Sequence, residues 1–332
     1  MKICYLGIGC WGYCLATHLA KKTYDVVAWS QDSNLVDTLI TARQHPRFKG
    51  IQAPPNLSFV HRLEEAIEGA DIIVESVTAA GLRSVCSLLS HLSIDPKAFI
   101  ITSKGIEQDT GLILPEVVKE VLGAQFQNKV GVLSGPSYAE EVINGLPATV
   151  VASAYDPSVI NQICHLFTNP TFRVYPNHDV IGVCFGGALK NVIAIACGIA
   201  GGLNYGSSAQ AALITRGLHE MRKLAASCGA KLETLNGLTG LGDLCLTSSS
   251  FLSRNYRFGT LLAKGMSREE ALKEIEVVVE GAYTCVTALQ LSEKNQVPMP
   301  ITEAVYHILY RDLPPRQAVK LLMERAIKEE HL

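Results

Sequence analysis

Short apolar runs alternate with helical patterns through the first half of the chain. The run KICYLGIG at residues 2–9 predicts a strand that ends in glycines. Further apolar strands are predicted at 25–30, 71–77, 98–103, 130–135 and 147–153, with a last one at 172–176. Helices are predicted between them, at 12–22, 63–69, 81–92, 112–122 and 137–144. Strands that alternate with helices in this way favour an α/β fold with a doubly wound, mainly parallel sheet.

After about residue 178 the apolar positions follow helical spacing. A helix is predicted at 208–228, and Ser267 with Glu270 forms a capping box that opens another. Three more helices are predicted at 282–296, 301–311 and 315–330, with prolines between them. We therefore expect an α/β domain over residues 1–178 and an all-helical domain over residues 179–332.

The most apolar run, residues 180–203, contains only two strongly polar residues, Lys190 and Asn191. A bilayer-spanning helix needs about 20 apolar residues, so the length would allow one. Its six glycines and the central lysine oppose that interpretation, because a lysine at the bilayer centre costs about 3 kcal/mol. Two alternatives remain: a core lysine whose aliphatic stem reaches the surface, and a functional lysine. Because burial lowers the pKa of an ammonium toward neutrality, Lys190 is the first candidate for proton transfer.

Composition narrows the class of protein. A chain of 332 residues is long enough for two domains, and its net charge of −2 does not indicate binding to nucleic acid or to an anionic membrane. The first residues run directly into a strand, so no signal peptide is expected and the protein is expected to be cytoplasmic. The ten cysteines are scattered singly, without the paired spacing of zinc ligands. We expect reduced thiols and no metal site.

A glycine motif follows the first predicted strand. Gly7, Gly9 and Gly12 have the G-x-G-x-x-G spacing, placed between a strand and a helix as a Rossmann dinucleotide site requires. The first glycine permits a tight turn, the second lets a pyrophosphate approach the backbone, and the third allows close packing of helix and strand. The helix that begins there would attract the phosphates. The motif therefore predicts a nicotinamide dinucleotide site.

The preference between the two nicotinamide cofactors is less well specified. NAD sites usually carry an acidic residue at the end of the second strand, where it binds the ribose 2′-hydroxyl. Here that strand ends in Ser30 and Gln31, Asp32 comes slightly late, and no arginine follows to bind a 2′-phosphate. We therefore expect the site to accept both NADPH and NADH.

Polar clusters interrupt the apolar pattern at five further places. Turn chemistry alone would explain each cluster taken singly. Two of them end parallel strands, where ligands bind in such sheets, and Ser253 to Asn255 combines a guanidinium with neutral donors suited to a phosphate. The clusters are Thr102–Gly105, Ser134–Glu141, Gly240–Leu244 with its carboxylate Asp243, Ser253-Arg254-Asn255, and Glu280-Gly281 after an apolar run.

Taken together, these segments resemble one family, the NAD(P)-dependent glycerol-3-phosphate dehydrogenases of the bacterial soluble type. The resemblance extends from the first strand into the last third of the chain, and it is the combination of motifs that makes it specific. The segments are GIGCWG at 7–12, SKG at 103–105, SGPSYAEE at 134–141, GGALKNVIAIACG at 186–198, ITRGLHEM at 214–221, GLGDL at 240–244, SRNYRFG at 253–259, VVEG at 278–281 and MPITEAVYHILY at 299–310.

The resemblance implies a role for each matching position. Lys190 matches the family's proton donor and acceptor at the substrate C2 oxygen. The positions that match substrate-binding residues are Lys104, Gly135, Ser137, Lys190, Asp243, Ser253, Arg254 and Asn255. The nucleotide-binding positions include the three glycines of the loop. They are Gly7, Gly9, Cys10, Trp11, Gly12, Gln31, Lys104, Ala139, Arg254, Val278 and Glu280.

Two positions depart from the family pattern. Cys10 stands where the family usually has serine, so a hydroxyl contact to the pyrophosphate is lost. Gln31 stands where many members carry a basic residue, which weakens the case for strict NADPH selectivity.

The resemblance implies reversible hydride transfer between NAD(P)H and dihydroxyacetone phosphate, giving sn-glycerol 3-phosphate for glycerophospholipid synthesis. Asp243 would hold either Lys190 or a substrate hydroxyl, and the sequence favours neither. Two other functions compete: a dehydrogenase of the same architecture that acts on a 2-hydroxy or 3-hydroxy acid, and a nucleotide-sensing protein without catalysis. A homodimer is expected only because it is the commonest assembly of soluble enzymes.

Overall fold

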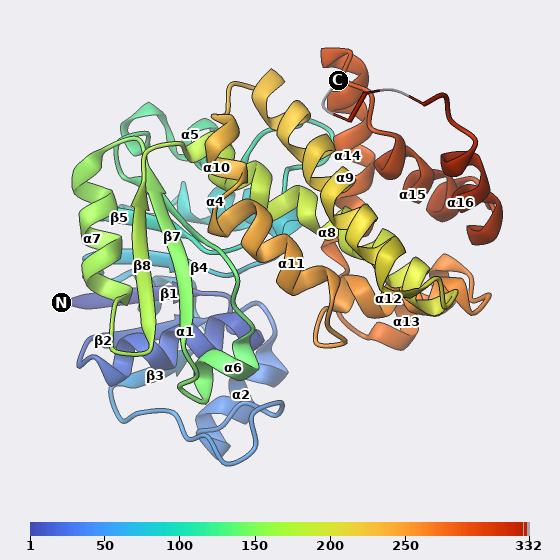
Figure 1. Cartoon of the computed structure of the whole chain (residues 1–332). Helices are drawn as coiled ribbons and strands as arrows, with labels where there is room; N and C mark the ends of the chain where they lie inside the picture. Colours follow the sequence, from blue (N-terminus) through green and yellow to red (C-terminus); the bar gives the residue numbers. More distant parts are fainter. Residues whose placement is uncertain (328, 331–332) are drawn as a thin grey trace.

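The computed structural model describes residues 1–327 and 329–330. Its first half folds around one eight-stranded sheet with the strand order β3-β2-β1-β4-β5-β6-β7-β8 (Figure 1). The strands are β1 (Lys2–Leu6), β2 (Asp25–Trp29), β3 (Leu57–Val60), β4 (Ile72–Glu75), β5 (Ala98–Ile101), β6 (Val130–Ser134), β7 (Ala148–Ala154) and β8 (Phe172–Asn177).

Neighbouring strands are parallel at every step of this order except one, where β7 pairs antiparallel with β6. The predicted mainly parallel sheet is therefore confirmed. The antiparallel step follows from the connection between these strands, which contains only the short helix α6 (Ala139–Ile143). Parallel neighbours need a longer crossover that returns the chain to the opposite end of the sheet.

Helices cover both faces of the sheet. One face packs against α1 (Cys10–Lys21) and α7 (Pro157–Phe167), and the other against α3 (Leu63–Ile67), α4 (Leu82–Leu89) and α5 (Leu114–Leu122). This double cover explains why β4, β5 and β6 are buried along their whole length and consist mostly of apolar residues.

Three elements of this half do not appear among the predicted ones: β3, α7 and α2 (Ser33–Ala42). Both helices begin at an aspartate cap, Asp32 and Asp156, whose side chain accepts a backbone N–H. Strand β3 is only four residues long, too short for its alternation to stand out.

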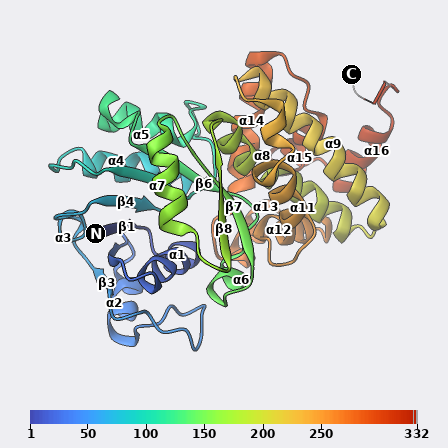
Figure 2. The ribbon, with the colours of Figure 1, turned by 60° about the vertical axis from the view of Figure 1, so that its left-hand side comes forward.

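The second half is helical, and its longest helix, α8 (Val180–Gly202), lies at its centre (Figure 2). Asp179 caps α8 by accepting the Gly182 N–H at 2.9 Å. The other helices are α9 (Gly206–Ser227), α10 (Leu232–Leu235), α11 (Asp243–Ser248), α12 (Arg254–Ala263), α13 (Arg268–Ile275), α14 (Glu280–Asn295), α15 (Pro300–Tyr310) and α16 (Pro315–Met323).

Helices α9, α14 and α15 begin and end within two residues of the predicted positions, whereas α10, α11 and α12 were not predicted. The capping box of Ser267 and Glu270 is confirmed at the start of α13. The last predicted helix, 315–330, is shorter in the structure and ends at Met323. Residue 328 of that prediction lies outside the described residues.

Helix α8 is long and apolar enough to cross a membrane by length and composition, but 94% of its apolar window is buried inside the protein. It packs against α12 so closely that a Cβ on Gly198 would lie 2.1 Å from the Tyr256 carbonyl oxygen. Its apolar side chains join a cluster that includes Val132 and Val151 of the sheet. Because the two halves share this core, the predicted domain division at residues 178 and 179 stays a prediction.

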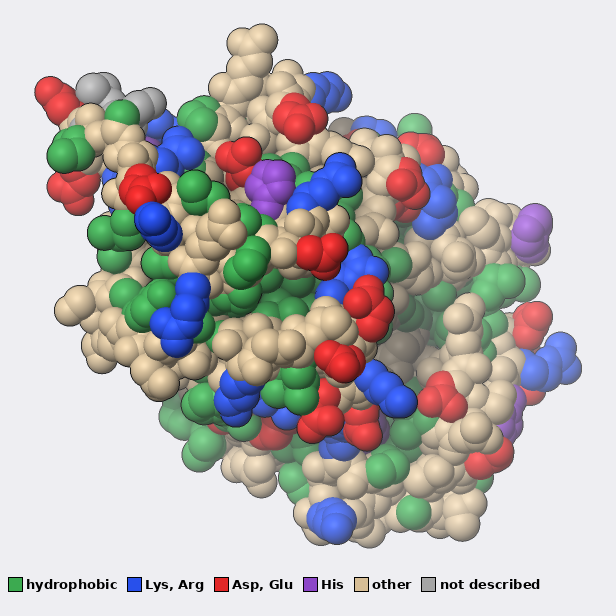
Figure 3. All heavy atoms as spheres, turned by 90° about the vertical axis from the view of Figure 1, so that its right-hand side faces the viewer, with side chains coloured by type: hydrophobic (Ala, Val, Ile, Leu, Met, Phe, Trp, Pro, Cys, Tyr) green, Lys and Arg blue, Asp and Glu red, His purple; other side chains and the backbone are tan. Residues whose placement is uncertain are grey.

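The surface carries no large field of one sign on the face shown in Figure 3, where acidic and basic side chains are interspersed. This agrees with the near-neutral net charge of −2.

Candidate active site

The glycine loop connects β1 to α1 as the motif predicts. Gly7 has a φ of 85° and donates its N–H to the Trp29 carbonyl at 2.8 Å. A Cβ on Gly12 would lie 1.9 Å from the Gly7 carbonyl oxygen, so no larger residue fits there. A Cβ on Gly9, in contrast, would meet nothing within 4 Å. The three glycines thus have the three separate roles that a pyrophosphate loop requires.

The N-terminus of α1 is suited to an anion. Its cap, Gly9, has no side-chain hydrogen bond, and its first turn contains no acidic residue. The backbone N–H groups of this turn are therefore available to phosphate oxygens. Trp11 is the second residue of α1, and its indole Nε1 is buried without a hydrogen-bond partner among the described residues. These features fit a dinucleotide, and a buried donor left unpaired is one that a ligand could satisfy.

The far end of the nucleotide site is more exposed. Gln31 follows β2 on the surface, and Asp32 accepts the Leu35 N–H at 3.1 Å, so its carboxylate caps α2.

Burial raises the pKa of the Cys10 thiol in the glycine loop, and the charge of Arg47 acts in the opposite direction. The sequence pattern does not point to Arg47, which lies 16 residues after Gln31 along the chain but close enough to the loop to act on Cys10.

A cluster of two lysines around one carboxylate lies between the sheet and α8. Lys190 of α8 donates to Asp243 Oδ1 at 2.5 Å, and Lys104, which follows β5, donates to Asp243 Oδ2 at 2.7 Å. Asp243 begins α11 and its side chain is 1% exposed, against 7% for Lys190 and 18% for Lys104. The structure therefore brings together three predicted residues from distant parts of the chain.

Burial lowers the pKa of Lys190 to about 7, with Asp243 opposing that fall and Lys104 adding to it. Burial by itself would raise the pKa of the Asp243 carboxyl, but the two lysines hold it below its ordinary value. The cluster therefore pairs a carboxylate that stays ionised with a lysine that can gain or lose a proton near neutral pH.

Thr247 also belongs to this cluster, although it is not among the residues predicted from the sequence. Its hydroxyl accepts a hydrogen bond from Lys190 at 2.8 Å and lies 3.3 Å from Asp243 Oδ1. Because Thr247 comes four residues after Asp243 in α11, the two side chains lie on one face of the helix. This four-residue spacing was the sequence signal that could have identified Thr247 as a neighbour of Asp243.

The segment after β6 lies against the same cluster. The Gly135 carbonyl accepts from Lys104 at 2.8 Å and from the Ser137 hydroxyl at 3.1 Å. Ala139, a predicted nucleotide position, begins α6 and is almost buried. Tyr138 donates to the Leu246 carbonyl of α11 at 2.8 Å, which ties this segment to the helix that carries Asp243.

The three residues of the predicted phosphate clamp differ in their surroundings. Ser253 caps α12 by accepting the Tyr256 N–H at 3.2 Å. Asn255 is buried, donates to Asn191 Oδ1 at 3.0 Å and accepts the Gly281 N–H at 3.0 Å. Arg254 is exposed and has no hydrogen bond or ion pair within residues 1–327 and 329–330. Arg254 is therefore a cation at a helix N-terminus that is available to an anion.

The start of α14 reaches back to the sheet. Glu280 accepts the Ala79 N–H at 3.3 Å, across the loop that follows β4. Burial raises the pKa of Glu280, and the charge of Arg254 opposes the rise. Val278 is 39% exposed beside it. These two predicted nucleotide positions thus lie where the helical half meets the carboxyl edge of the sheet.

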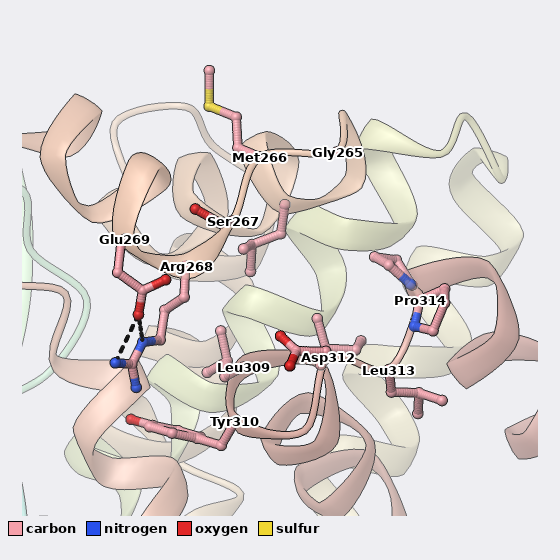
Figure 4. Close-up of a pocket in the computed structure, with 13 residues that line it drawn as sticks. Gly265, Met266, Ser267, Arg268, Glu269, Leu309, Tyr310, Asp312, Leu313 and Pro314 are labelled. Atoms are coloured by element: carbon pink, nitrogen blue, oxygen red, sulfur yellow. Dashed lines mark hydrogen bonds and ion pairs between the residues drawn. The ribbon is translucent and has the colours of Figure 1, made fainter.

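A separate hollow lies on the helical half, away from every predicted site residue. It is lined by the segments around Ser267 and Tyr310, where the Arg268 guanidinium stacks 4.7 Å from the Tyr310 ring and pairs with Glu269 (Figure 4). Elsewhere, the described residues contain no cluster of three His, Cys, Asp or Glu that could hold a metal ion, and all ten cysteines are unpaired.

Comparison with known proteins gives a consistent result. Residues 2–160 and 179–320 match the N-terminal and C-terminal models of NAD-dependent glycerol-3-phosphate dehydrogenase. The chain is 57% identical to glycerol-3-phosphate dehydrogenase [NAD(P)+] of Protochlamydia amoebophila over 100% of this chain and 99% of that protein. It is 54% identical to the Chlamydia pneumoniae protein of the same name over 99% and 98%. The crystal structure of the Coxiella burnetii glycerol-3-phosphate dehydrogenase is 39% identical, with a TM-score of 0.92 over 98% of this chain and 99% of that one.

Proposed function

The chain belongs to the NAD-dependent glycerol-3-phosphate dehydrogenase family, and we propose on that basis that it interconverts dihydroxyacetone phosphate and sn-glycerol 3-phosphate with Lys190 as the proton donor and acceptor. The observation that supports this role best is the buried cluster in which Asp243 pairs with both Lys190 and Lys104. The cluster lies at the carboxyl edge of the sheet, where ligands bind in open α/β folds.

In the reducing direction, the nicotinamide cofactor supplies a hydride to the C2 carbonyl carbon when it is bound. Lys190, as the ammonium, donates a hydrogen bond to the C2 oxygen, stabilises the negative charge that develops there and transfers its proton to it. The neutral amine then regains a proton from water. In the oxidising direction the neutral amine takes the proton from the C2 hydroxyl.

Asp243 keeps Lys190 in place and sets its basicity. Its carboxylate stays ionised and favours the ammonium form, whereas Lys104 and burial oppose it. Thr247 accepts a second hydrogen bond from the ammonium and restricts it further. A lysine without such restraints would have several rotamers available, and holding it in one geometry lowers the cost of reaching the transition state.

The substrate phosphate is bound by Arg254 and by the N-terminal N–H groups of α12. The remaining substrate positions, Lys104, Gly135, Ser137, Ser253 and Asn255, shape the site around it. On the nucleotide side, Gly7, Gly9 and Gly12 at the start of α1 would hold the pyrophosphate. Cys10, Trp11, Gln31, Ala139, Val278 and Glu280 complete that side, with Lys104 and Arg254 shared between the two ligands.

The enzyme uses NADPH or NADH, since the exposed Gln31 offers neither an acid for the ribose nor a cation for a 2′-phosphate. We also propose that it acts in the cytoplasm as a homodimer and supplies sn-glycerol 3-phosphate for glycerophospholipid synthesis.

Initial-rate kinetics with dihydroxyacetone phosphate and each reduced cofactor test this function. Turnover of dihydroxyacetone phosphate, with no turnover of a panel of 2-keto and 3-keto acids, supports it. A preference for a keto acid would favour the rival dehydrogenase. Binding of NADH without turnover of any ketone would favour a nucleotide-sensing protein and would overturn the proposal.

A further inference from the structure

Glu75 is a fully buried carboxylate that has no assigned role in the site. It is the last residue of β4, it is 0% exposed, and it lies between Leu6 of β1 and Ile101 of β5 in the register of the sheet. No ion pair of Glu75 occurs within the part of the chain that the structure describes. Burial raises the pKa of this carboxyl to about 7.

All hydrogen bonds of this carboxylate join it to the two loops at the carboxyl edge of the sheet. One oxygen, Oε1, accepts the Ser103 hydroxyl at 2.6 Å and the Ser103 N–H at 3.4 Å. The other, Oε2, accepts the Val77 N–H at 3.0 Å. The hydrogen bonds of Glu75 therefore link the loop after β4 to the loop after β5.

Both loops contain or contact residues that are proposed to bind a ligand. Ser103 precedes Lys104, whose ammonium contacts Asp243 and the Gly135 carbonyl. The loop after β4 packs on the nucleotide loop, since a Cβ on Gly7 would lie 2.9 Å from the Ser76 carbonyl carbon. The same loop donates the Ala79 N–H to Glu280. One buried side chain is thus hydrogen-bonded to two loops of the site, and the first of these packs on the nucleotide loop.

Folding alone does not account for a glutamate here. Burying a carboxylate that has no cationic partner is unfavourable, and an apolar side chain would pack between Leu6 and Ile101 without that penalty. The backbone of β4 is already paired with β1 and β5. What the carboxylate adds is the set of hydrogen bonds to Ser103 and Val77.

We propose that Glu75 is a positioning residue for the reaction, which acts through Ser103 to hold Lys104 against Asp243 and through Val77 to hold the loop that packs on the nucleotide glycines. This inference rests on the proposed function, because it assigns Glu75 to the lysine cluster and the nucleotide loop. Glu75 itself does not contact the reacting atoms.

Four single variants and the double variant of Ser103→Ala with Glu75→Gln test the inference. Ser103→Ala removes the hydroxyl contact and leaves the buried carboxylate, whereas Ser103→Thr keeps a hydroxyl. Glu75→Gln keeps the shape but replaces one acceptor with a donor. Glu220→Gln is the matched control, since Glu220 is also buried, has a pKa that burial raises to about 7, and accepts two backbone N–H groups and a threonine hydroxyl.

Ser103→Ala and Glu75→Gln should each lower kcat/KM for dihydroxyacetone phosphate about tenfold, the effect of losing one hydrogen bond to a charged group. Ser103→Thr should restore most of the loss. The double variant should lose about as much as the worse single variant, because both act on one contact. Glu220→Gln should keep the kinetic constants of the unsubstituted enzyme. Thermal unfolding of each variant separates these effects from a loss of stability.

Three results would overturn the inference: unchanged kcat/KM in Ser103→Ala, no recovery in Ser103→Thr, or losses that multiply in the double variant. If Glu75→Gln does not fold, the comparison of Ser103→Ala with Ser103→Thr is enough to test the inference. Absence of turnover in the unsubstituted enzyme would overturn the proposed function instead. In that case the NADH dissociation constant of Glu75→Gln, which alters the contact with Val77, still decides the positioning role, and an unchanged constant counts against it.

Discussion

The Asp243 carboxylate lies 2.5 Å from the Lys190 ammonium and contacts a second ammonium, that of Lys104, with its other oxygen. The sequence left open whether Asp243 holds Lys190 or a substrate hydroxyl, and the structure places it on the lysine. Because Lys104 shares the carboxylate, it also weakens the hold of Asp243 on the Lys190 proton. Burial is the main reason that a lysine paired with an aspartate can still titrate near neutral pH, and Lys104 adds to its effect.

Asp243→Asn should abolish most of the turnover. Without the carboxylate, burial and Lys104 both disfavour the ammonium form of Lys190, so the pKa of Lys190 falls further. We expect kcat for dihydroxyacetone phosphate to fall about 100-fold or more, the usual contribution of a general acid. The NADH dissociation constant, measured by fluorescence, should stay close to that of the unsubstituted enzyme. A kcat near the original value would remove Asp243 from the mechanism.

The two directions of the reaction should depend on pH with opposite signs. Since burial lowers the pKa of Lys190 to about 7, reduction requires the ammonium and its kcat/KM should fall as pH rises above about 7. Oxidation requires the neutral amine, so its kcat/KM should rise up to the same pH and then level off. Rate profiles from pH 5.5 to 9 check this. In Lys190→Arg the step should disappear, because a guanidinium stays charged over that range.

Arg254→Ala should weaken recognition of the substrate phosphate. A charge-assisted hydrogen bond contributes about 1.5–3 kcal/mol, so kcat/KM for dihydroxyacetone phosphate should fall about 10- to 100-fold. At saturating NADH, the unphosphorylated ketone dihydroxyacetone should be reduced equally slowly by the variant and the unsubstituted enzyme. Arg268→Ala, which alters the hollow of Figure 4, serves as the control and should leave these constants unchanged. An equal loss with both ketones would place Arg254 outside the phosphate site.

Gly9→Ala should impair NADH binding, whereas Gly12→Ala should reduce the stability of the fold. The new Cβ at position 9 meets no protein atom within 4 Å, so the fold should keep its stability while the NADH dissociation constant rises about tenfold or more. The new Cβ at position 12 would lie 1.9 Å from the Gly7 carbonyl oxygen, so the strand–helix junction itself should be destabilised. Thermal unfolding and NADH titration distinguish the two outcomes. Normal NADH affinity in Gly9→Ala would contradict the assigned loop.

Glu220→Ala should reduce stability without affecting catalysis. Glu220 of α9 is 4% exposed and accepts the N–H groups of Ile301 at 2.6 Å and Thr302 at 3.1 Å, which begin α15. Leaving these donors unpaired should cost about 2–4 kcal/mol in the free energy of unfolding. The same contact joins two of the family-like segments, 214–221 and 299–310, and gives them a structural role.

The pH dependence of this loss has a definite sign. Burial raises the pKa of Glu220 to about 7, above its unfolded value, so its stabilising contribution is fully present below the unfolded pKa and decreases as pH rises toward 7. The difference in Tm between Glu220→Ala and the unsubstituted enzyme should therefore narrow from pH 5 to pH 8. A difference that widens over this range would contradict the raised pKa.

Features that depend on neighbouring residues could be predicted from the sequence. The strand–helix alternation, the glycine loop from Gly7 to Gly12 and the capping box at Ser267 are local patterns, set by side-chain periodicity and backbone geometry within a few residues. Lys190 stood out for the same reason, as a charge within an apolar run. Strand β3 is too short to show such a pattern. Helices α2 and α7 each begin at an aspartate cap, and α7 buries apolar residues at helical spacing, so their local signals were present although neither helix was predicted.

The chain by itself thus determined the parallel core of the sheet, the nucleotide loop and the candidate lysine. Only the tertiary structure decided which groups surround that lysine, because Asp243 lies 53 residues from Lys190 and 139 from Lys104 along the chain. It also decided that β7 turns antiparallel and that the carboxylate of Glu75 lies beneath the loops of the site. The pKa of a lysine depends on burial and on charges within a few ångströms, and those distances exist only once distant segments have packed together.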